Sequence, residues 1–214
     1  MDRQRDDTAA DPGVELGVAL LDAGDGRRLE RLGRWVVDRP APMAMEPARW
    51  RPGRWSGADL RFDRSRGWSA RSGPVPASWP VEVAGLRLEL RPAASGGIGL
   101  YPEHAANVGW LEERIAEATA ALGRAPVVLN LFAHTGLLTL AAARAGASVT
   151  HVDAARGTVG WARANAAANE LADRPIRWIV DDAPAFVERE TRRGRRYDGL
   201  VIDPPSFGRS GGAR

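Results

Sequence analysis

The second half of the sequence alternates short apolar segments with segments of helical periodicity, and no other feature limits the possible fold as strongly. The apolar segments have the length of buried strands, and those between them have the length of helices. Strands that alternate with helices form parallel βαβ units, whose sheet is covered on both faces. We therefore predict an α/β, Rossmann-like sheet. The predicted strands are 126–132, 148–152, 176–181 and 197–202, and the predicted helices are 103–122, 136–145, 156–171 and 184–192.

The sequence before residue 99 has a different pattern, in which short apolar runs are broken by Gly, Pro and Asp. Leu86, Leu88 and Leu90 alternate with polar residues, which is typical of a half-buried strand, and Ala84-Gly85 is a candidate turn. This pattern predicts a small antiparallel β subdomain in front of the α/β domain. The predicted divisions are 1–15 for a disordered lead, 16–98 for the β subdomain and 99–214 for the α/β domain.

Five tryptophans lie in or near these short runs, and several stand beside arginine. Stacking on nucleobases is one interpretation of them. The interpretation we favour is a small domain that uses large aromatic side chains as its core. They are Trp35, Trp50, Trp55, Trp68 and Trp79.

The sequence ends shortly after the fourth predicted strand of the α/β domain. Doubly wound sheets normally continue past this point, and an open edge strand favours aggregation. We therefore expect the sheet to be incomplete and the domain to be truncated.

Composition excludes several kinds of site. There is no cysteine, which excludes disulfides, thiolate metal ligands and a thiol nucleophile within these residues, and three scattered histidines do not predict a metal site. Neither a signal peptide nor an apolar run of the ~18 residues that a membrane span needs is present, so we expect a cytoplasmic protein. All 30 basic residues are arginine, but the net charge of +3 is small, so nucleic-acid binding is permitted rather than indicated.

The residues after the first predicted strand suggest a ligand site, because ligands of open α/β sheets bind at the carboxyl ends of strands. This loop contains Phe132, His134, Thr135 and Gly136. It lacks the G-x-G-x-x-G pattern that holds a pyrophosphate against a helix N-terminus. We therefore expect a nucleoside ligand without a pyrophosphate, which favours S-adenosylmethionine over a nicotinamide dinucleotide.

Three acidic residues end the next three predicted strands. Asp153 is placed to accept hydrogen bonds from both hydroxyls of a ribose, and Asp182 from an adenine amino group, although each has helix capping as its alternative role. Asp203 precedes Pro204 and Pro205, and its carboxylate can accept from an amino or ring N–H, while Phe207 can stack on a base. An Asp-Pro-Pro turn alone does not indicate a functional site. Because two other predicted strands also end at an acidic residue, we favour a ligand site here.

Six short strings together resemble the class I S-adenosylmethionine-dependent methyltransferases related to the base methyltransferases of bacterial large-subunit (23S) ribosomal RNA. Each string alone is weak, but they occur in order over nearly the whole chain. The resemblance implies a class I fold, S-adenosylmethionine as cofactor, and methylation of a base with ribosomal RNA as partner. The strings are 25–33, 99–104, 130–136, 152–153, 181–183 and 203–207.

The resemblance also implies roles for single residues. The loop after the first strand binds the methyl donor, Asp153 its ribose and Asp182 its adenine, while Asp203 faces the methyl group and the target base. The segment 101–104 resembles a loop near the donor pocket. The cofactor set is Asn130, Phe132, His134, Thr135, Gly136, Asp153, Ala154, Asp182, Ala183 and Asp203, and the catalytic set is Asp203, Pro204, Pro205 and Phe207.

Two departures from the family pattern leave alternatives open. Asn130 stands where the family usually has Asp, which leaves a weaker partner for the amino group of the donor's methionine. Members that methylate C5 of cytosine use a Cys, usually further along the chain, so carbon and nitrogen acceptors both stay open. No His or Lys lies within 203–207, which suits a ring nitrogen that needs positioning more than a base. A non-catalytic nucleoside- or RNA-binding copy and, less favoured, a nucleotide-dependent oxidoreductase are the alternative functions.

Overall fold

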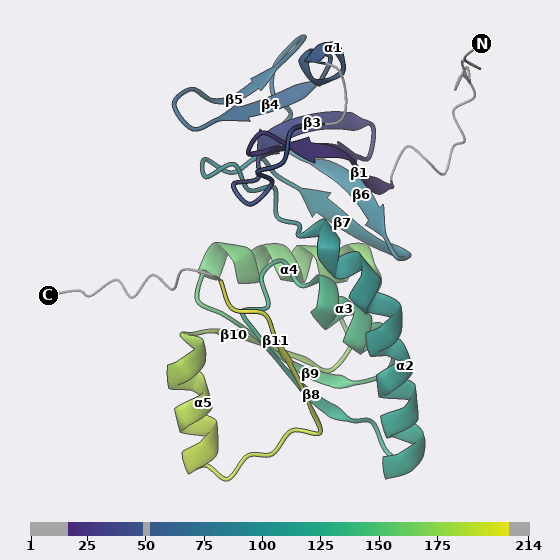
Figure 1. Cartoon of the computed structure of the whole chain (residues 1–214). Helices are drawn as coiled ribbons and strands as arrows, with labels where there is room; N and C mark the ends of the chain where they lie inside the picture. Colours follow the sequence, from purple (N-terminus) through teal and green to yellow (C-terminus); the bar gives the residue numbers. More distant parts are fainter. Residues whose placement is uncertain (1–16, 49–51, 206–214) are drawn as a thin grey trace, which may run out of the picture. The chain divides into compact units, whose positions relative to one another are not determined.

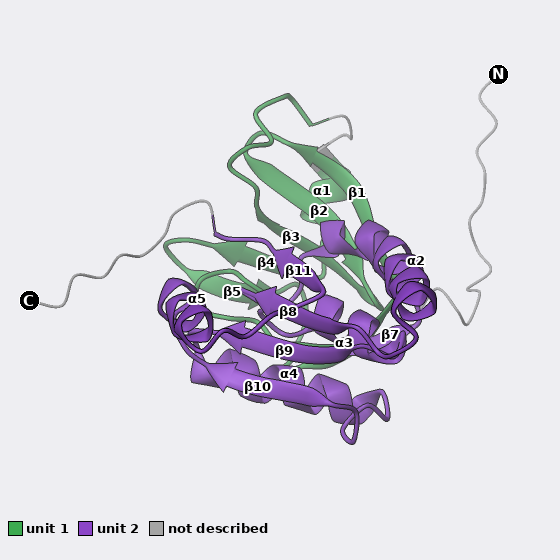
Figure 2. Ribbon diagram, turned by 90° about the horizontal axis from the view of Figure 1, so that it is seen from below, with its two compact units in different colours: residues 1–83, 89–99 green, residues 84–88, 100–214 purple. Residues whose placement is uncertain are grey.

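The computed structural model describes residues 17–48 and 52–205, which form the helices and strands drawn in Figure 1. The chain divides into two compact units, coloured separately in Figure 2: residues 1–83 with 89–99, and residues 84–88 with 100–214. The predicted division into domains at 98–99 stays a prediction, and the compact units differ from it at 84–88. The predicted lead at 1–15 lies outside the described residues.

The described residues before Gly99 form strands and one short helix. They are β1 (Val18–Gly24), β2 (Arg27–Leu32), β3 (Trp35–Pro40), α1 (Pro52–Ser56), β4 (Leu60–Asp63), β5 (Gly67–Ala70), β6 (Trp79–Val83) and β7 (Leu86–Leu90).

One sheet of the first unit has the strand order β1-β2-β3-β4-β5, and β6 pairs with β7. β1–β2, β2–β3 and β4–β5 are antiparallel, as predicted. β3 and β4 differ from the prediction because they pair in parallel. Parallel neighbours need a long connection instead of a hairpin, and the segment 41–59, which contains α1, supplies it.

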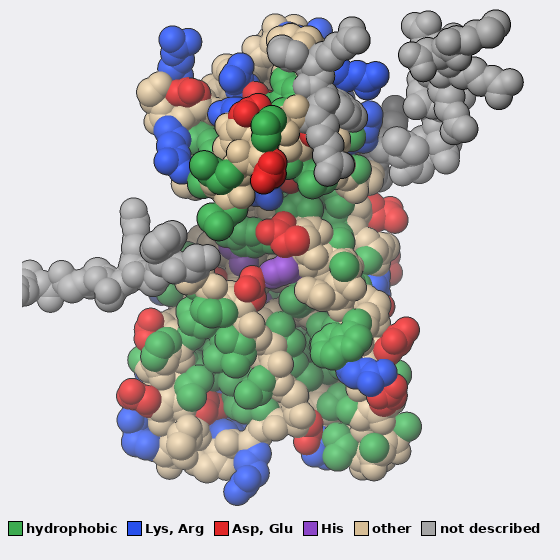
Figure 3. All heavy atoms as spheres, viewed as in Figure 1, with side chains coloured by type: hydrophobic (Ala, Val, Ile, Leu, Met, Phe, Trp, Pro, Cys, Tyr) green, Lys and Arg blue, Asp and Glu red, His purple; other side chains and the backbone are tan. Residues whose placement is uncertain are grey.

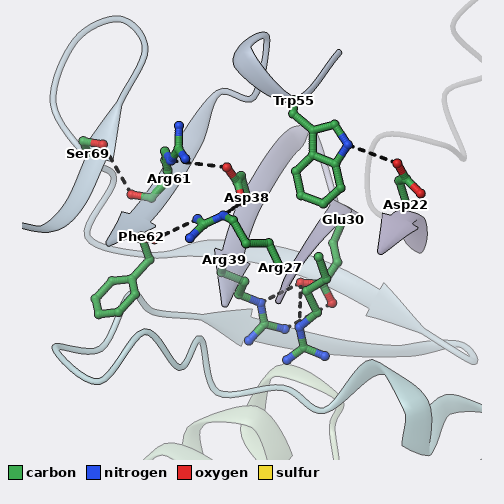
Figure 4. A network of polar contacts seen from close by, with 10 residues as sticks. Asp22, Arg27, Glu30, Asp38, Arg39, Trp55, Arg61, Phe62 and Ser69 are labelled. Atoms are coloured by element: carbon green, nitrogen blue, oxygen red, sulfur yellow. Dashed lines mark hydrogen bonds and ion pairs between the residues drawn. The ribbon is translucent and has the colours of Figure 1, made fainter. Parts of the chain in front are cut away.

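Buried carboxylates of this sheet are paired with arginines (Figure 4). Glu30, 3% exposed, accepts from Nε and Nη2 of Arg39 at 2.6 and 3.2 Å. Asp38, 1% exposed, accepts from Nε of Arg27 at 2.6 Å and lies 3.3 Å from Nε of Arg61. A carboxylate that is buried without a partner lowers the stability of the fold by several kcal/mol. Because the arginine partners lie on neighbouring strands, these strands stabilise one another.

The tryptophans of the first unit support the core interpretation over nucleobase stacking. The indole nitrogens of Trp55, Trp68 and Trp79 donate to acceptors within the unit over 2.8 to 3.0 Å. Trp79 is buried, and its ring centroid lies 6.4 Å from that of Trp35. Trp50 lies outside the described residues. The rings of Trp55, Trp68 and Trp79 thus satisfy their own polar groups inside the unit, as buried indoles usually do. The indole nitrogen of Trp35 is buried and has no hydrogen-bond partner within the described residues.

The second unit contains the predicted alternation of strands and helices. Helix α4 ends at 168 instead of the predicted 171, because the backbone at Glu170 takes a left-handed conformation, φ 58°. The other bounds lie within two residues of the predicted ones. The elements are η1 (Pro102–His104), α2 (Ala105–Leu122), β8 (Val127–Leu131), α3 (Leu137–Arg144), β9 (Ser148–Asp153), α4 (Arg156–Ala168), β10 (Ile176–Val180), α5 (Ala183–Arg192) and β11 (Gly199–Ile202).

The four strands of this unit form one parallel sheet in the order β10-β9-β8-β11, which confirms the α/β prediction. Successive side chains of a strand point to opposite faces. Leu129, Leu131 and Val152 point to the face on which Phe186 of α5 packs. Asn130 points to the other face, where it contacts α3. No helix among the described residues is long and apolar enough to cross a membrane.

Candidate active site

The carboxyl ends of β8, β9, β10 and β11 lie at one edge of the sheet, because every pair of neighbours is parallel. The strand order places Asp182, Asp153, the loop 132–136 and Asp203 along this edge in that sequence. Three steps between strands of about 4.8 Å span about 14 Å. The amide of Asp181 donates to the carbonyl of Asp153 at 3.1 Å, so β9 and β10 end level with each other.

The loop 132–136 has an unusual backbone. Phe132 and His134 take positive φ values of 54° and 50° although neither is glycine. Non-glycine residues in this region are uncommon and cluster at ligand sites. Gly136 has a φ of 94°, and a Cβ there would lie 3.1 Å from the Cβ of Ala162 in α4. The backbone therefore favours glycine here, and a larger residue would also crowd Ala162.

Asp153 fixes this loop to the end of β9. Its Oδ2 accepts from the amide of His134, and its Oδ1 accepts from the amide of Ala155, both at 2.9 Å. Helix α4 has Ala155 as its N-cap and no side-chain cap, so Asp153 does not have the capping role. Each carboxylate oxygen can accept a further hydrogen bond. Ala154, next to it, is exposed.

Asp182 does cap a helix. It is the N-cap of α5, and its Oδ1 accepts from the amide of Ala185 at 3.1 Å. One oxygen is left for other partners, so capping and ligand binding remain compatible. Ala183 is buried in the core between α5 and the sheet, and its contact with the donor stays a prediction. Asp181 is paired with Arg189.

Asn130 belongs to a buried chain of polar groups behind the loop. Its side chain is 4% exposed, and its Nδ2 donates to Oγ1 of Thr139 at 2.9 Å. The same hydroxyl lies 2.9 Å from Nδ1 of His151. The amide nitrogen of Asn130 is thus directed into the core. The predicted contact with a donor's amino group rests on the amide oxygen alone and stays a prediction.

His151 is fully buried, and burial lowers its pKa to about 3, with smaller contributions from His134 and Arg163. Its Nε2 has no hydrogen-bond partner within the described residues. The Thr139 hydroxyl accepts from Asn130. It can donate to Nδ1 of a neutral His151 ring that carries its proton on Nε2, or accept from Nδ1–H of the other tautomer.

We expect the chain to lose stability as the pH falls below about 6.5, the ordinary pKa of histidine. The pKa of His151 is lowered in the folded state, so the unfolded state binds the proton first. The stabilisation is complete above pH 6.5 and declines toward pH 3 by about 1.4 kcal/mol per pH unit. Urea unfolding at pH 7, 6 and 5 measures this slope. His151→Gln should show a shallower slope, and an identical slope in the two proteins would contradict the assignment.

His104 is a site residue that the strand pattern did not identify. Its Nε2 lies 2.9 Å from Oδ2 of Asp203, although the two residues are far apart in the sequence. The His104 side chain is 22% exposed and that of Asp203 is 60% exposed. Figure 3 shows histidine beside acidic side chains on this face of the molecule. The only sequence signal for His104 was the string 99–104.

The same segment brings an aromatic ring to the loop. The ring centroid of Tyr101 lies 5.0 Å from that of His134 and 5.9 Å from that of His104. Burial lowers the pKa of His134, Asp153 raises it, and His104 lowers it further. The net lowering keeps the His134 imidazole neutral at neutral pH. The Tyr101–His104 segment therefore joins the loop 132–136 to Asp203.

The structure brings most of the predicted residues to one edge, but not all of them are described. Pro204 and Pro205 follow Asp203 and are exposed. Phe207 lies outside the described residues, so its stacking role stays a prediction. Thr135 is buried at the start of α3. A hollow of about 330 Å³ on the β11 side of Asp203 is lined by His104, Asn107, Trp110, Leu111, Leu138, Leu200, Val201, Ile202 and Asp203.

Comparisons with curated proteins find ribosomal RNA methyltransferases. The chain is 40% identical over 83 residues to ribosomal RNA large subunit methyltransferase K/L of Syntrophotalea carbinolica, a match over 38% of this chain and 11% of that protein. It is 27% identical over 157 residues to ribosomal RNA large subunit methyltransferase I of Salmonella arizonae, over 70% of this chain and 37% of that protein. The chain thus matches only a part of these relatives. No family model matches it.

Solved structures of methyltransferases share the fold. A SAM-dependent methyltransferase from Agrobacterium tumefaciens matches 90% of this chain with a TM-score of 0.83 and 38% identity, and this match covers 61% of that protein. The methyltransferase SMU.776, solved with SAH, matches 93% of this chain with a TM-score of 0.74 and 20% identity, over 54% of its own length. These likenesses confirm the resemblance found in the sequence. By fold and by sequence, the chain is related to S-adenosylmethionine-dependent methyltransferases, and its curated relatives act on large-subunit ribosomal RNA.

Proposed function

We propose that the chain carries the donor-binding part of an S-adenosylmethionine-dependent methyltransferase that methylates a base in large-subunit ribosomal RNA. The observation that carries this proposal is the single sheet edge at which Asp182, Asp153, the loop 132–136 and Asp203 follow one another. Its span of about 14 Å matches an extended adenosyl group with an attached methionine. The matched part of the curated relatives supports the same activity.

The charges of this edge suit the proposed donor. S-adenosylmethionine, when bound, supplies a methyl group on a positively charged sulfonium. Asp153 and Asp203 provide negative charge at the edge, and the lowered pKa of His134 keeps that ring from adding a competing positive charge. We assign the ribose hydroxyls to the remaining acceptor positions of Asp153 and the adenine amino group to Asp182. A carboxylate that accepts from hydroxyls contributes about 1.5–3 kcal/mol per bond.

The acceptor side is assigned to Asp203. Its carboxylate accepts a hydrogen bond from an N–H of the target base, and Pro204 and Pro205 limit the backbone that carries it. In the transfer, the carbon–sulfur bond of the methyl group breaks while a lone pair of the acceptor atom forms the new bond. S-adenosylhomocysteine leaves, and an acceptor that carried a hydrogen releases one proton to solvent. The protein contributes mainly the positions of the two reactants.

Calorimetric titration of the chain with S-adenosylmethionine, S-adenosylhomocysteine and NADH tests the donor assignment. We expect the first two to bind and NADH not to bind, because the loop lacks the glycines that admit a pyrophosphate. Transfer of a tritiated methyl group to large-subunit ribosomal RNA transcribed in vitro then tests the activity. Donor binding without transfer would favour the non-catalytic alternative, and NADH binding in place of the donor would refute the proposal.

A further inference from the structure

We propose that His104 is a positioning residue for methyl transfer, which holds the Asp203 carboxylate in the orientation that the acceptor base requires. This inference rests on the proposed function. In the proposed arrangement Nε2–H of His104 donates to Oδ2 of Asp203, and Oδ1 is left to accept from an N–H of the base. The observation behind it is the 2.9 Å contact between side chains from two distant elements.

The side chain of Asp203 needs such support because most of it is open to solvent. Its side chain is 60% exposed and follows the last residue of β11, where the ladder to β8 has ended. An exposed carboxylate in this position samples several rotamers, and ordering it at the moment of binding costs entropy. A displacement of about 1 Å at a reacting group can lower a rate about 100-fold. A hydrogen-bond donor that is fixed at one oxygen of the Asp203 carboxylate therefore has a large effect on the position of the other oxygen.

His104 is itself held by a rigid element. It ends the η1 turn, its amide donates to the carbonyl of Tyr101 at 3.1 Å, and it is the N-cap of α2. Helix α2 is anchored by its buried residues Val108, Leu111 and Ile115. The ring is packed near Tyr101, with 22% of the side chain exposed. The imidazole thus has fewer free rotamers than the carboxylate that it contacts.

The arrangement also gives different roles to the two oxygens of the Asp203 carboxylate. An ionised carboxylate only accepts hydrogen bonds, so the oxygen that faces His104 needs a donor and the other oxygen selects an acceptor base with an N–H. The string 203–207 contains no His. The structure adds a residue from before the first strand of the domain.

Three substitutions of His104 distinguish positioning from a general structural effect. Glutamine places its amide nitrogen close to where Nε2 lies, so His104→Gln keeps a donor to Asp203. Asparagine is shorter and does not reach, and His104→Ala removes the donor. We expect His104→Ala and His104→Asn to lower kcat about 10-fold, the effect of losing one hydrogen bond worth about 1.4 kcal/mol. His104→Gln should stay within about threefold, and the donor Kd should stay within about threefold in all three.

A second readout does not depend on turnover. Nitrogen-15 NMR of the histidine rings should show His104 with its proton on Nε2, and Asp203→Asn should shift that signal. Combined with Asp203→Ala, which leaves no acceptor for Nε2–H, His104→Ala should cost much less than it costs alone, because the partner is already lost. Equal kcat values for wild type, His104→Asn and His104→Ala, or an unshifted signal, would overturn the inference while leaving methyl transfer itself intact. Absence of transfer by the wild type would instead refute the proposed function.

If His104→Ala or His104→Asn fails to fold, which circular dichroism would show, the Asp203→Asn shift of the His104 resonance decides the case. The exposed Glu113 of α2 provides the matched control. Glu113→Ala should change neither kcat nor the ring signal of His104.

Discussion

Replacement of Asp203 by alanine should lower kcat for methyl transfer to large-subunit ribosomal RNA by about 100- to 1,000-fold, the usual effect of removing a group that orients the reacting atoms. The donor Kd should stay within about threefold, because Asp203 is assigned to the acceptor side. In the proposed function this carboxylate accepts from the N–H of the base, and the substitution removes that contact. Calorimetry for the donor and single-turnover transfer for the rate separate the two effects.

The conservative variant Asp203→Asn sharpens this prediction. It keeps the shape of the side chain but loses the charge, and its amide nitrogen cannot accept from Nε2–H of His104. We expect a loss intermediate between those of wild type and Asp203→Ala. A kcat for Asp203→Ala within twofold of wild type would remove Asp203 from the mechanism, and a large rise in the donor Kd would move it to the donor side.

Replacement of Asp153 by alanine should raise the Kd for S-adenosylmethionine by about 100- to 1,000-fold. Two hydrogen bonds to a charged carboxylate are worth about 3–6 kcal/mol together. Tenfold in affinity corresponds to about 1.4 kcal/mol, so the expected rise corresponds to the lower part of this range. The variant also removes the acceptor for the amide of His134. In the structure this amide nitrogen lies 2.9 Å from Oδ2 of Asp153. The donor would therefore lose its ribose contacts and also the fixed course of the loop. Calorimetric titration measures the change.

Two further variants test whether the loss comes from the ribose. Asp153→Asn keeps one oxygen that can accept, so its Kd should lie between those of wild type and Asp153→Ala. Asp173 is an exposed acid in the connection that leads into the amino end of β10, and Asp173→Ala should leave the Kd unchanged. Unchanged affinity in Asp153→Ala would refute the ribose assignment. Equal losses in both Asp153 variants and in Asp173→Ala would indicate a general effect of charge.

The order of elements in the second unit could be predicted from the sequence because its signals are local. Strands β8, β9, β10 and β11 each read as a short apolar run, and helices between them read as amphipathic periodicity. Parallel order then follows from short strands joined by helices. From that order alone, the acids at 153, 182 and 203 are placed at the same edge of a sheet, which the structure confirms.

The parallel pairing of β3 and β4 could not be predicted in this way. Adjacent short strands usually form hairpins, and the alternation within a strand is the same in both kinds of ladder. Pairing in parallel depends on how the connection that contains α1 returns across the sheet, which is a property of the assembled unit. The same limit applies to the buried pairs of Glu30 and Asp38, whose partners lie on neighbouring strands.

At the site, the sequence by itself determined which residues end the strands, because strand length and periodicity are read from near neighbours along the chain. Only the tertiary structure decided what those residues touch. It placed Asp153 on the amides of His134 and Ala155 instead of at the N-cap position of α4. It also directed the amide nitrogen of Asn130 into the core and brought His104 to Asp203. Such contacts join elements separated by many residues, and their geometry is set by packing, for which a linear pattern carries no signal.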